Sequence, residues 1–416
     1  MRIALVLTGL FAGGAQRRML TLAAEFLARG HAVDVVVPNA DGPFRDRIPA
    51  AARLIALDPL LANIPGVAAR KSLLQLASVV PLARYLRREV PDVVLSSSTP
   101  ANLAALLARD LAAAVGRDPS TRVDRDLATR VARDLAGSEI PVVACVNVPI
   151  SSSTTTRGRP FQGLLVRRYY PRAAAIITIA EALANDTAAF TGVARERIVA
   201  VPFPIDVGRI RELAACTFDH PWFAAGEPPV VLGVGKLKPQ KDFATLVRAF
   251  AVVRASRPAR LLILGDGEER EALLSLAQDL GIAADVSLPG YCDNPFPAMA
   301  KAAVLALSSR WEGFSNVASE ALACGCPVVA TRCPGGVAEL LGEGRYGRLV
   351  PVGDSTALAA ALVATLDHPP PRAELEARAD EFPVGRAAGR TLDVLEDCVA
   401  RRWSAAGARQ EGGASR

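Results

Sequence analysis

Short apolar runs alternate with longer amphipathic segments through the first 200 residues. The apolar runs predict strands at residues 3–7, 33–37, 52–57, 92–96, 142–146, 175–179 and 198–201. Helical spacing predicts helices at 15–29, at 67–88 with a break at Pro81, from about residue 100, and at 181–190. In the first of these helices we expect Leu20, Ala23, Ala24 and Leu27 to face inward. Strands that alternate with helices predict a parallel, doubly wound sheet.

A second alternating segment follows residues 202–229, where proline and glycine mark a linker. Strands are predicted at 230–235, 261–264, 286–288 and 327–330, and helices at 242–253, 269–280 and about 386–402. A chain of 416 residues is also too long for one core. We therefore expect an α/β chain with domains at 1–205 and 206–384, a last helix at 385–403 and a disordered tail at 404–416.

One stretch, at residues 109–139, interrupts the alternation. It contains three copies of Arg-Asp-Leu-Ala, which begin at Arg109, Arg125 and Arg133. The copies are too short and too irregularly spaced for stacked repeats, so we expect a surface insertion with one or two helices and exposed ion pairs.

The N-terminal residues 1–13 resemble a secretory leader, but they also read as the first strand and turn of the sheet, which is the interpretation we favour. The chain nowhere contains 18 consecutive apolar residues, so we expect no transmembrane helix. Seven cysteines, an odd number at uneven spacing, do not form a disulfide pattern and favour a reducing compartment. Cys324 and Cys326 have no CxxC partner, and we expect them to pack in a core rather than bind a metal.

The formal charge of +6 and the pI near 9.1 show a mild excess of basic residues. A mild basic excess suits an anionic substrate or an anionic membrane surface. The basic residues are not interleaved with aromatic ones as single-strand binding requires, so nucleic acid is not expected as a partner.

The most informative stretch is 308–336, SSRWEGFSNVASEALACGCPVVATRCPGG. Glu312 and Glu320 flank a short loop, and Ser315 is expected to cap a helix that ends at Gly325. Amides at a helix start attract an anion such as a diphosphate, and a carboxylate can accept two hydrogen bonds from a vicinal diol. The alternative is that both glutamates are ordinary surface residues of a helix.

This segment resembles the E-x7-E signature of the retaining glycosyltransferases of family 4, which have the GT-B fold. The resemblance implies two Rossmann-like domains, the second of which binds a nucleotide sugar, and a last helix that returns to the first domain. It assigns the transferred sugar to Glu312 and the donor ribose to Glu320. The donor loop between them comprises Gly313, Phe314, Ser315, Asn316 and Val317.

The stretch 233–241, GVGKLKPQK, resembles the donor diphosphate motif of the same family. Carried over, Lys236 and Lys241, beside Gly235, neutralise the charge that develops on the diphosphate, and no metal or other cofactor is expected. Gly290 and Tyr291 resemble the loop that receives the nucleotide base, although Tyr291 could equally be a wall residue.

In the first domain, residues 13–17 resemble the GGAER loop of the family, with Gln16 in place of glutamate. The resemblance implies that Gly13 and Gly14 let backbone amides approach a phosphate or the acceptor; the alternative is a helix start without a ligand. Many members carry a histidine near the transferred sugar, where this chain has Val146. We expect Asn147 to make the contact with the transferred sugar in place of that histidine.

Together these features predict a retaining glycosyltransferase that moves a hexose or N-acetylhexosamine from a nucleotide diphosphate sugar, expected to be UDP-linked, to a saccharide or lipid-linked acceptor. A sugar-nucleotide epimerase and a non-catalytic sugar-nucleotide-binding protein remain as alternatives. We expect a cytoplasmic protein. The leucines and arginines of residues 67–88 suit either weak contact with an anionic membrane or packing on the sheet.

Overall fold

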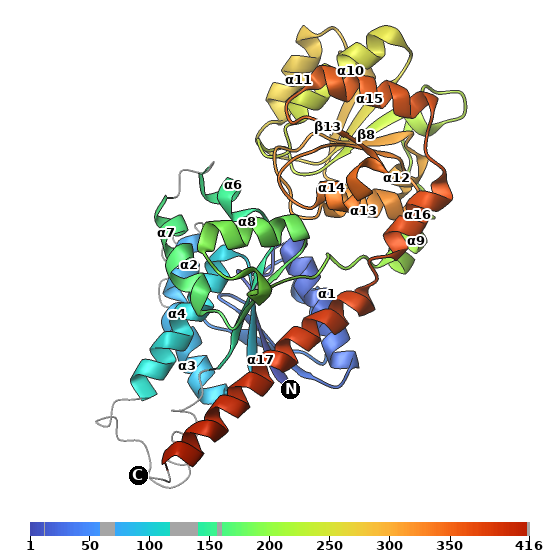
Figure 1. Cartoon of the computed structure of the whole chain (residues 1–416). Helices are drawn as coiled ribbons and strands as arrows, with labels where there is room; N and C mark the ends of the chain where they lie inside the picture. The colour runs from blue at the N-terminus through green and yellow to red at the C-terminus, as the bar shows by residue number, and fades with distance from the viewer. Residues whose placement is uncertain (12, 59–70, 117–139, 156–159, 414–416) are drawn as a thin grey trace. The chain divides into compact units, whose positions relative to one another are not determined.

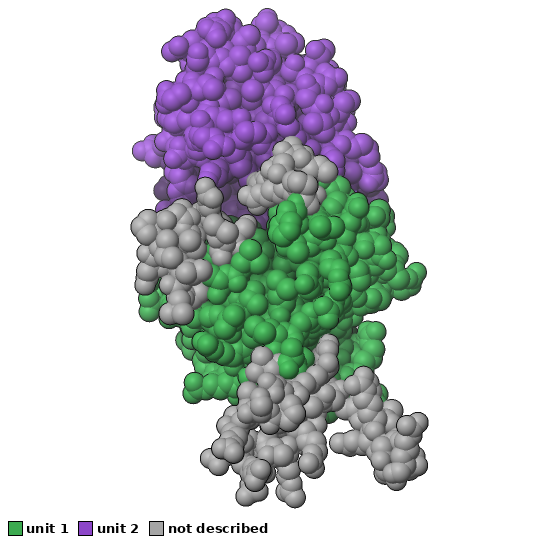
Figure 2. Space-filling view, turned by 90° about the vertical axis from the view of Figure 1, so that its left-hand side faces the viewer, with its two compact units in different colours: residues 1–179, 184–201, 384–416 green, residues 180–183, 202–383 purple. Residues whose placement is uncertain are grey.

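The computed structural model describes residues 1–11, 13–58, 71–116, 140–155 and 160–413 (Figure 1). These residues form two compact units, coloured separately in Figure 2. Unit 1 comprises residues 1–179, 184–201 and 384–416, and unit 2 comprises 180–183 and 202–383.

Unit 1 is built on a seven-stranded parallel sheet in the order β3-β2-β1-β4-β5-β6-β7. Apolar runs of three to six residues form its strands, and the central ones are buried on both faces, as a covered parallel sheet requires. The strands are β1 (Arg2–Val6), β2 (Ala32–Val37), β3 (Arg53–Ala56), β4 (Val93–Ser97), β5 (Val142–Val146), β6 (Ala175–Thr178) and β7 (Ile198–Ala200).

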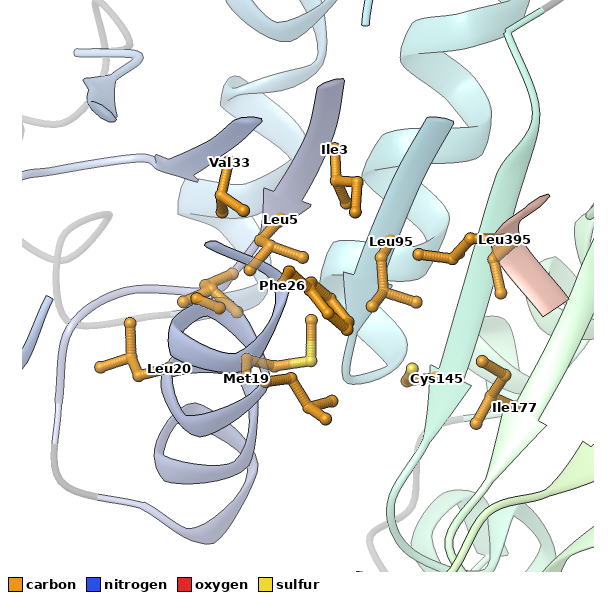
Figure 3. Close-up of a cluster of buried hydrophobic side chains, with 14 of the residues drawn as sticks. Ile3, Leu5, Met19, Leu20, Phe26, Val33, Leu95, Cys145, Ile177 and Leu395 are labelled. Carbon is orange, nitrogen blue, oxygen red and sulfur yellow. The ribbon is translucent and has the colours of Figure 1, made fainter. Parts of the chain in front are cut away.

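Helices cover both faces of this sheet. They are α1 (Gly14–Ala28), α2 (Lys71–Ala77), α3 (Val79–Glu89), α4 (Thr99–Gly116), α6 (Ile150–Thr155), α7 (Pro160–Tyr169), α8 (Glu181–Thr191) and α17 (Val384–Gly413). On one face, Met19 and Phe26 of α1 and Leu395 of α17 pack on strand residues such as Leu5 and Cys145 (Figure 3). Side chains of α3, α4 and α7 form the core on the other face.

Two expectations for the first helices of unit 1 need correction. Ala24 is exposed, because the inward face of α1 follows Met19, Leu22, Ala23 and Phe26 instead. The break in the expected helix 67–88 lies at Ser78, not at Pro81. Pro81 is tolerated because it lies in the first turn of α3, where a backbone N–H has no partner within the helix. Residues 67–70 lie outside the described part of the chain.

The first residues of the expected insertion at 109–139 belong to a helix of the sheet domain instead. Residues 109–116 complete α4, and Arg109 is buried rather than exposed: its Nη1 donates to the carbonyl of Arg172 at 2.8 Å, and its Nη2 lies 2.7 Å from Asp110 Oδ1. Residues 117–139 are not described. At the other end of the chain α17 continues to Gly413, so the expected tail is helical over 404–413; its alanines and glutamine are good helix formers.

Unit 2 contains a six-stranded parallel sheet in the order β10-β9-β8-β11-β12-β13. Its strands are β8 (Val230–Val234), β9 (Arg260–Leu264), β10 (Val286–Gly290), β11 (Val304–Leu307), β12 (Val328–Thr331) and β13 (Arg348–Val350). The helices are α9 (Val207–Ala214), α10 (Phe243–Ser256), α11 (Arg270–Asp279), α12 (Phe296–Lys301), α13 (Asn316–Ala323), α14 (Val337–Leu340), α15 (Ser355–Asp367) and α16 (Arg372–Asp380). Side chains of α10, α11 and α15 form the core on one face of the sheet.

The strand order of unit 2 positions its functional residues. From β8 the chain proceeds outward through β9 and β10, then returns to form β11 on the opposite side of β8. The loops after β8 and β11 therefore start side by side at the same edge of the sheet. In open parallel sheets, ligands bind at such a reversal, at the carboxyl ends of the strands.

Candidate active site

A lysine and a glutamate from the loops after β8 and β11 meet at this reversal in unit 2. Lys241 Nζ lies 2.5 Å from Glu312 Oε1, and Ser309 Oγ donates to the same oxygen at 2.7 Å. The side chains of Lys241 and Glu312 are only 14% and 8% exposed. A charge pair this well covered costs desolvation that a surface pair does not, so it is a stronger sign of function than an exposed pair.

Side-chain and backbone hydrogen bonds hold the two loops against each other. Gln240 Nε2 donates to the Trp311 carbonyl at 2.8 Å, and the Arg310 N–H donates to the Gln240 carbonyl at 2.8 Å. Ser308 Oγ donates to the Lys241 carbonyl at 2.9 Å. The lysine and the glutamate are therefore fixed by their backbones as well as by their own contact.

The loop that follows Glu312 presents the start of α13. Ser315 has φ of 64°, an uncommon conformation for a serine, and its Oγ accepts the Ala318 N–H at 3.4 Å. This confirms the expected cap. Gly335 approaches the loop so closely that a Cβ there would lie 1.9 Å from the Glu312 carbonyl oxygen. Only glycine can occupy this position without displacing the glutamate.

A row of glycines terminates three neighbouring strands at the same edge. Gly235, Gly265 and Gly290 all have positive φ, and the Gly265 N–H donates to the Gly290 carbonyl at 2.8 Å. A Cβ on Gly265 would lie 1.9 Å from the Gly235 carbonyl oxygen. The row keeps side chains away from this edge, next to Lys241.

Phe314 and Ser315, expected among the donor-binding residues, have side chains that are already occupied. The Phe314 ring is 1% exposed and packs edge-on against Phe382, with centroids 5.1 Å apart. The Ser315 hydroxyl caps α13. Any contact of these two residues with a ligand therefore falls to their backbone.

The remaining expected donor residues lie on the same part of unit 2. Asn316 and Val317 form the first turn of α13, and Glu320 lies partly exposed in its second turn. Lys236 is exposed in the loop after β8, and Tyr291, which directly follows β10, is 71% exposed.

A further carboxylate faces this region from the loop after β9. Burial raises the pKa of Glu269, and the charges of Asp242 and Glu268 raise it further, against a smaller opposing effect of Arg310. Glu269 Oε2 is buried without a hydrogen bond. The group therefore opposes additional negative charge nearby.

In unit 1 the expected residues lie at the start of α1, which follows β1, and directly after β5. Gly13 precedes α1, and Gln16 Nε2 donates to Thr8 Oγ1 at 3.1 Å. Asn147 Nδ2 donates to Ser97 Oγ at 2.9 Å, while Asn147 Oδ1 accepts from Arg18 Nη1 at 3.3 Å. Val146, at the position of the histidine of other members, is 4% exposed and belongs to the core.

Several residues that complete the two sites were missed from the sequence. Ser308 and Ser309 follow β11, a strand whose alanine and leucines are equally good helix formers and were not assigned. Thr331 Oγ1, which contacts the Ser309 carbonyl, ends the next strand. Arg18 was missed because a helical arginine is usually exposed. The sequence did offer one signal for Ser308 and Ser309, because two polar residues directly after a buried apolar run are typical of the end of a strand.

The described residues contain no group of three or more histidines, cysteines or carboxylates that could hold a metal ion. Burial raises the pKa of Cys324, Cys326 and Cys333 each to about 12, so these thiols are protonated and not prepared as ligands. Among the same residues, no helix combines the length and the apolar character needed to cross a membrane.

Both halves of the chain match family models. Residues 13–204 match the family described as "Glycosyl transferase 4-like domain", and residues 228–368 match "Glycosyl transferases group 1". The second match includes Lys236, Lys241, Glu312 and Glu320.

Related proteins carry glycosyltransferase names. The chain is 41% identical over 128 residues to N-acetylgalactosamine-N,N'-diacetylbacillosaminyl-diphospho-undecaprenol 4-alpha-N-acetylgalactosaminyltransferase of Campylobacter jejuni, a match covering 31% of this chain and 34% of the relative. It is 34% identical over 179 residues to the lipopolysaccharide core biosynthesis glycosyltransferase LpsE of Rhizobium meliloti, covering 43% of this chain and 50% of the relative. These matches therefore span a third to a half of the relatives' lengths.

Solved structures share the fold along nearly the whole chain. Anabaena HepE in complex with UDP superposes with a TM-score of 0.69 at 19% identity and covers 95% of this chain and 100% of its own. The apo form of the lipopolysaccharide outer core galactosyltransferase WaaB gives a TM-score of 0.67 at 18% identity, covering 95% and 99%. The expected GT-B fold is confirmed. With both halves matched by glycosyltransferase models, this chain belongs to the GT-B glycosyltransferases of family 4.

Proposed function

We propose that the chain is a retaining glycosyltransferase that moves a hexose or an N-acetylhexosamine from a UDP-linked donor to a saccharide or lipid-linked acceptor. The observation that carries this proposal is the covered Lys241–Glu312 pair at the strand reversal of unit 2. The UDP-bound structural neighbour supports the choice of nucleotide.

In the proposed mechanism, the donor diphosphate lies along the glycine row and the start of α13. Backbone amides at the start of α13 donate hydrogen bonds to phosphate oxygens, and the helix terminus favours negative charge. The Gly235 and Gly265 N–H groups already donate to the Leu264 and Gly290 carbonyls, so the glycine row contributes close approach rather than donors. Negative charge builds on the departing diphosphate as the glycosidic bond breaks. Lys241, held at the site by the loop contacts, and Lys236, exposed beside it, stabilise that charge.

The two glutamates accept hydrogen bonds from donor hydroxyls in this proposal. Glu312 is anchored by Ser309 and Lys241 through Oε1, which leaves Oε2 to accept from a hydroxyl of the transferred sugar. Glu320, in the second turn of α13, accepts from the ribose diol. Neither carboxylate is required to protonate anything, and the leaving diphosphate is a good leaving group without a proton.

The class of acceptor is proposed from the relatives. One relative's name includes diphospho-undecaprenol, and two others are named for lipopolysaccharide core biosynthesis. An acceptor of this kind would be anionic, which agrees with the mild basic excess of the chain.

Incubation of the purified protein with a panel of sugar nucleotides tests the proposal. A glycosyltransferase releases UDP slowly from its own donor even without an acceptor. An epimerase instead converts the donor sugar without releasing UDP, and a binding protein leaves it unchanged. Absence of UDP release from every donor that binds would contradict the proposal.

A further inference from the structure

A buried arginine without a counter-charge lies at the carboxyl edge of the unit 1 sheet. Arg18 of α1 is 0% exposed, yet its Nε and Nη2 make no hydrogen bond. Its Nη1 donates a hydrogen bond to Asn147 Oδ1 at 3.3 Å. A guanidinium keeps its charge in proteins, so burying it among neutral partners alone is costly.

The neighbours of Arg18 do not supply the missing negative charge. The guanidinium also faces the thiol of Cys145, and burial raises the pKa of that thiol, which therefore stays neutral. Burial lowers the pKa of Arg18 itself, as expected where a cation is desolvated without compensation. None of the carboxylates in the described residues forms an ion pair with it in this structure.

A series of hydrogen bonds from Arg18 through Asn147 leads towards the surface. An arginine only donates, so it fixes the Asn147 oxygen inward and turns the amide nitrogen to Ser97 Oγ, 2.9 Å away. Asn147 is partly exposed. The charge of Arg18 thus acts on a group that a ligand can reach.

The same place holds the start of the 18-residue helix α4 and a strained serine. Ser98, directly before α4, has φ of 87°, and its Oγ is buried without a partner. Its N–H donates to the Cys145 carbonyl at 3.4 Å, which ties the start of α4 to β5 and to the surroundings of Arg18. Backbone strain in a non-glycine residue concentrates at functional sites.

We propose that Arg18, Asn147 and Ser98 form, with the start of α4, a binding site for an anionic group, either a phosphate or a carboxylate. The positive end of a long helix and an unpaired guanidinium both favour an anion. The further step, that this anion belongs to the acceptor, rests on the proposed function.

Thermal unfolding of the full chain in saturating UDP, which occupies the donor site, tests the proposal. Sodium phosphate, sodium acetate and sodium chloride are compared at equal ionic strength. For the wild type we expect phosphate or acetate to raise the Tm by about 2 °C or more beyond chloride, because a ligand of the native state stabilises it. Phosphate alone assigns a phosphate, and an equal effect of acetate admits a carboxylate.

Arg18→Met should lose this increase in Tm. Without added anion its Tm should be no lower than that of the wild type, since an uncompensated charge is replaced by an apolar side chain of similar length. Arg18→Lys should keep part of the increment and serves if the Met variant does not fold. Arg88→Met, at a side chain 87% exposed in the same unit, is the control and should keep all of it. A wild type that responds equally to chloride, or a Met variant that keeps the increment, overturns the proposal. Failure of UDP to bind would instead refute the proposed function.

Discussion

At the scale of single residues, the contact between Lys241 and Glu312 is the feature most open to test. Glu312→Gln and Lys241→Ala should each lower kcat by two orders of magnitude or more, since loss of one group that stabilises a transition state commonly costs that much. Lys301→Ala removes the same charge from an exposed position of unit 2 and should leave kcat unchanged.

Stability has to be measured beside kcat for these variants. Removing Lys241 leaves a covered carboxylate with Ser309 as its remaining described partner, and breaking such a pair destabilises a protein by about 3 to 5 kcal/mol. Circular dichroism at the assay temperature separates unfolding from loss of catalysis. A folded Lys241→Ala protein with near wild-type kcat at saturating donor would refute the assigned role.

Glu269 gives a prediction of pH dependence. Because its pKa is raised in the folded protein, its ionised form destabilises the fold at neutral pH, and stability is regained as pH falls through that raised pKa. Glu269→Gln should therefore raise the Tm at pH 7, and the gain should shrink as the pH falls through the raised pKa and be absent below the ordinary glutamate pKa. A gain that persists unchanged at acid pH would show that another cause is at work.

At the scale of elements, the strand ends depend on glycines that differ in what surrounds them. Gly265 and Gly281 both have positive φ, but a Cβ on Gly265 would meet the Gly235 carbonyl at 1.9 Å, whereas nothing lies within 4 Å of one on Gly281. Gly281→Ala should cost roughly 1 to 2 kcal/mol, the ordinary penalty for a left-handed residue. Gly265→Ala should cost at least about 2 kcal/mol more and weaken UDP binding, as measured by chemical unfolding and calorimetry.

Most elements could be predicted from the sequence because apolar runs and amphipathic spacing differ clearly in a doubly wound sheet. The failures have specific causes. β11 is a short run of residues that favour helices, and only its place between β8 and β12 makes it a strand. The expected helix ends too early at residue 403 because the last residues of a chain are usually poorly ordered, whereas α17 continues to Gly413.

The candidate site was predictable in unit 2 and less so in unit 1. Glu312, Glu320 and Lys241 stand in a recognisable spacing, whereas the support from Ser309 follows from a hydrogen bond that spacing does not reveal. Arg18 lies within a regular helical pattern, and its burial depends on how α1 packs on β5. Unpaired buried groups of this kind become visible only in three dimensions.

At the scale of the whole molecule, we predict that EDTA leaves the rate of donor turnover nearly unchanged. Lys236 and Lys241 with the start of α13 provide positive potential where a metal ion would otherwise act. The comparison is the rate of UDP release with EDTA, with and without added manganese. Loss of activity on chelation that manganese restores would overturn the prediction.

The remaining prediction concerns weak attachment of the whole protein to an anionic membrane. Leu86 of α3 is 1% exposed and packs on the sheet, as the packing alternative expects, whereas Leu76 of α2 is 46% exposed. The outer face of α3 instead presents Val80, 48% exposed, with Arg84, Arg87 and Arg88 at helical spacing. Three arginines near an anionic surface contribute about 3 kcal/mol at low salt, enough for detectable but reversible binding.

Flotation with liposomes tests this attachment. The protein should float with anionic vesicles at low salt, stay in solution with neutral vesicles, and be released at high salt, because the attraction is screened. Reversal of the three α3 arginines to glutamate should abolish flotation. Reversal of three exposed basic residues of unit 2 is the charge-matched control and should have a smaller effect; these are Arg248, Lys301 and Arg345. If both reversals act equally, net charge rather than the face of α3 governs binding, and if the wild type never floats, the arginines of α3 serve only as a solvated surface.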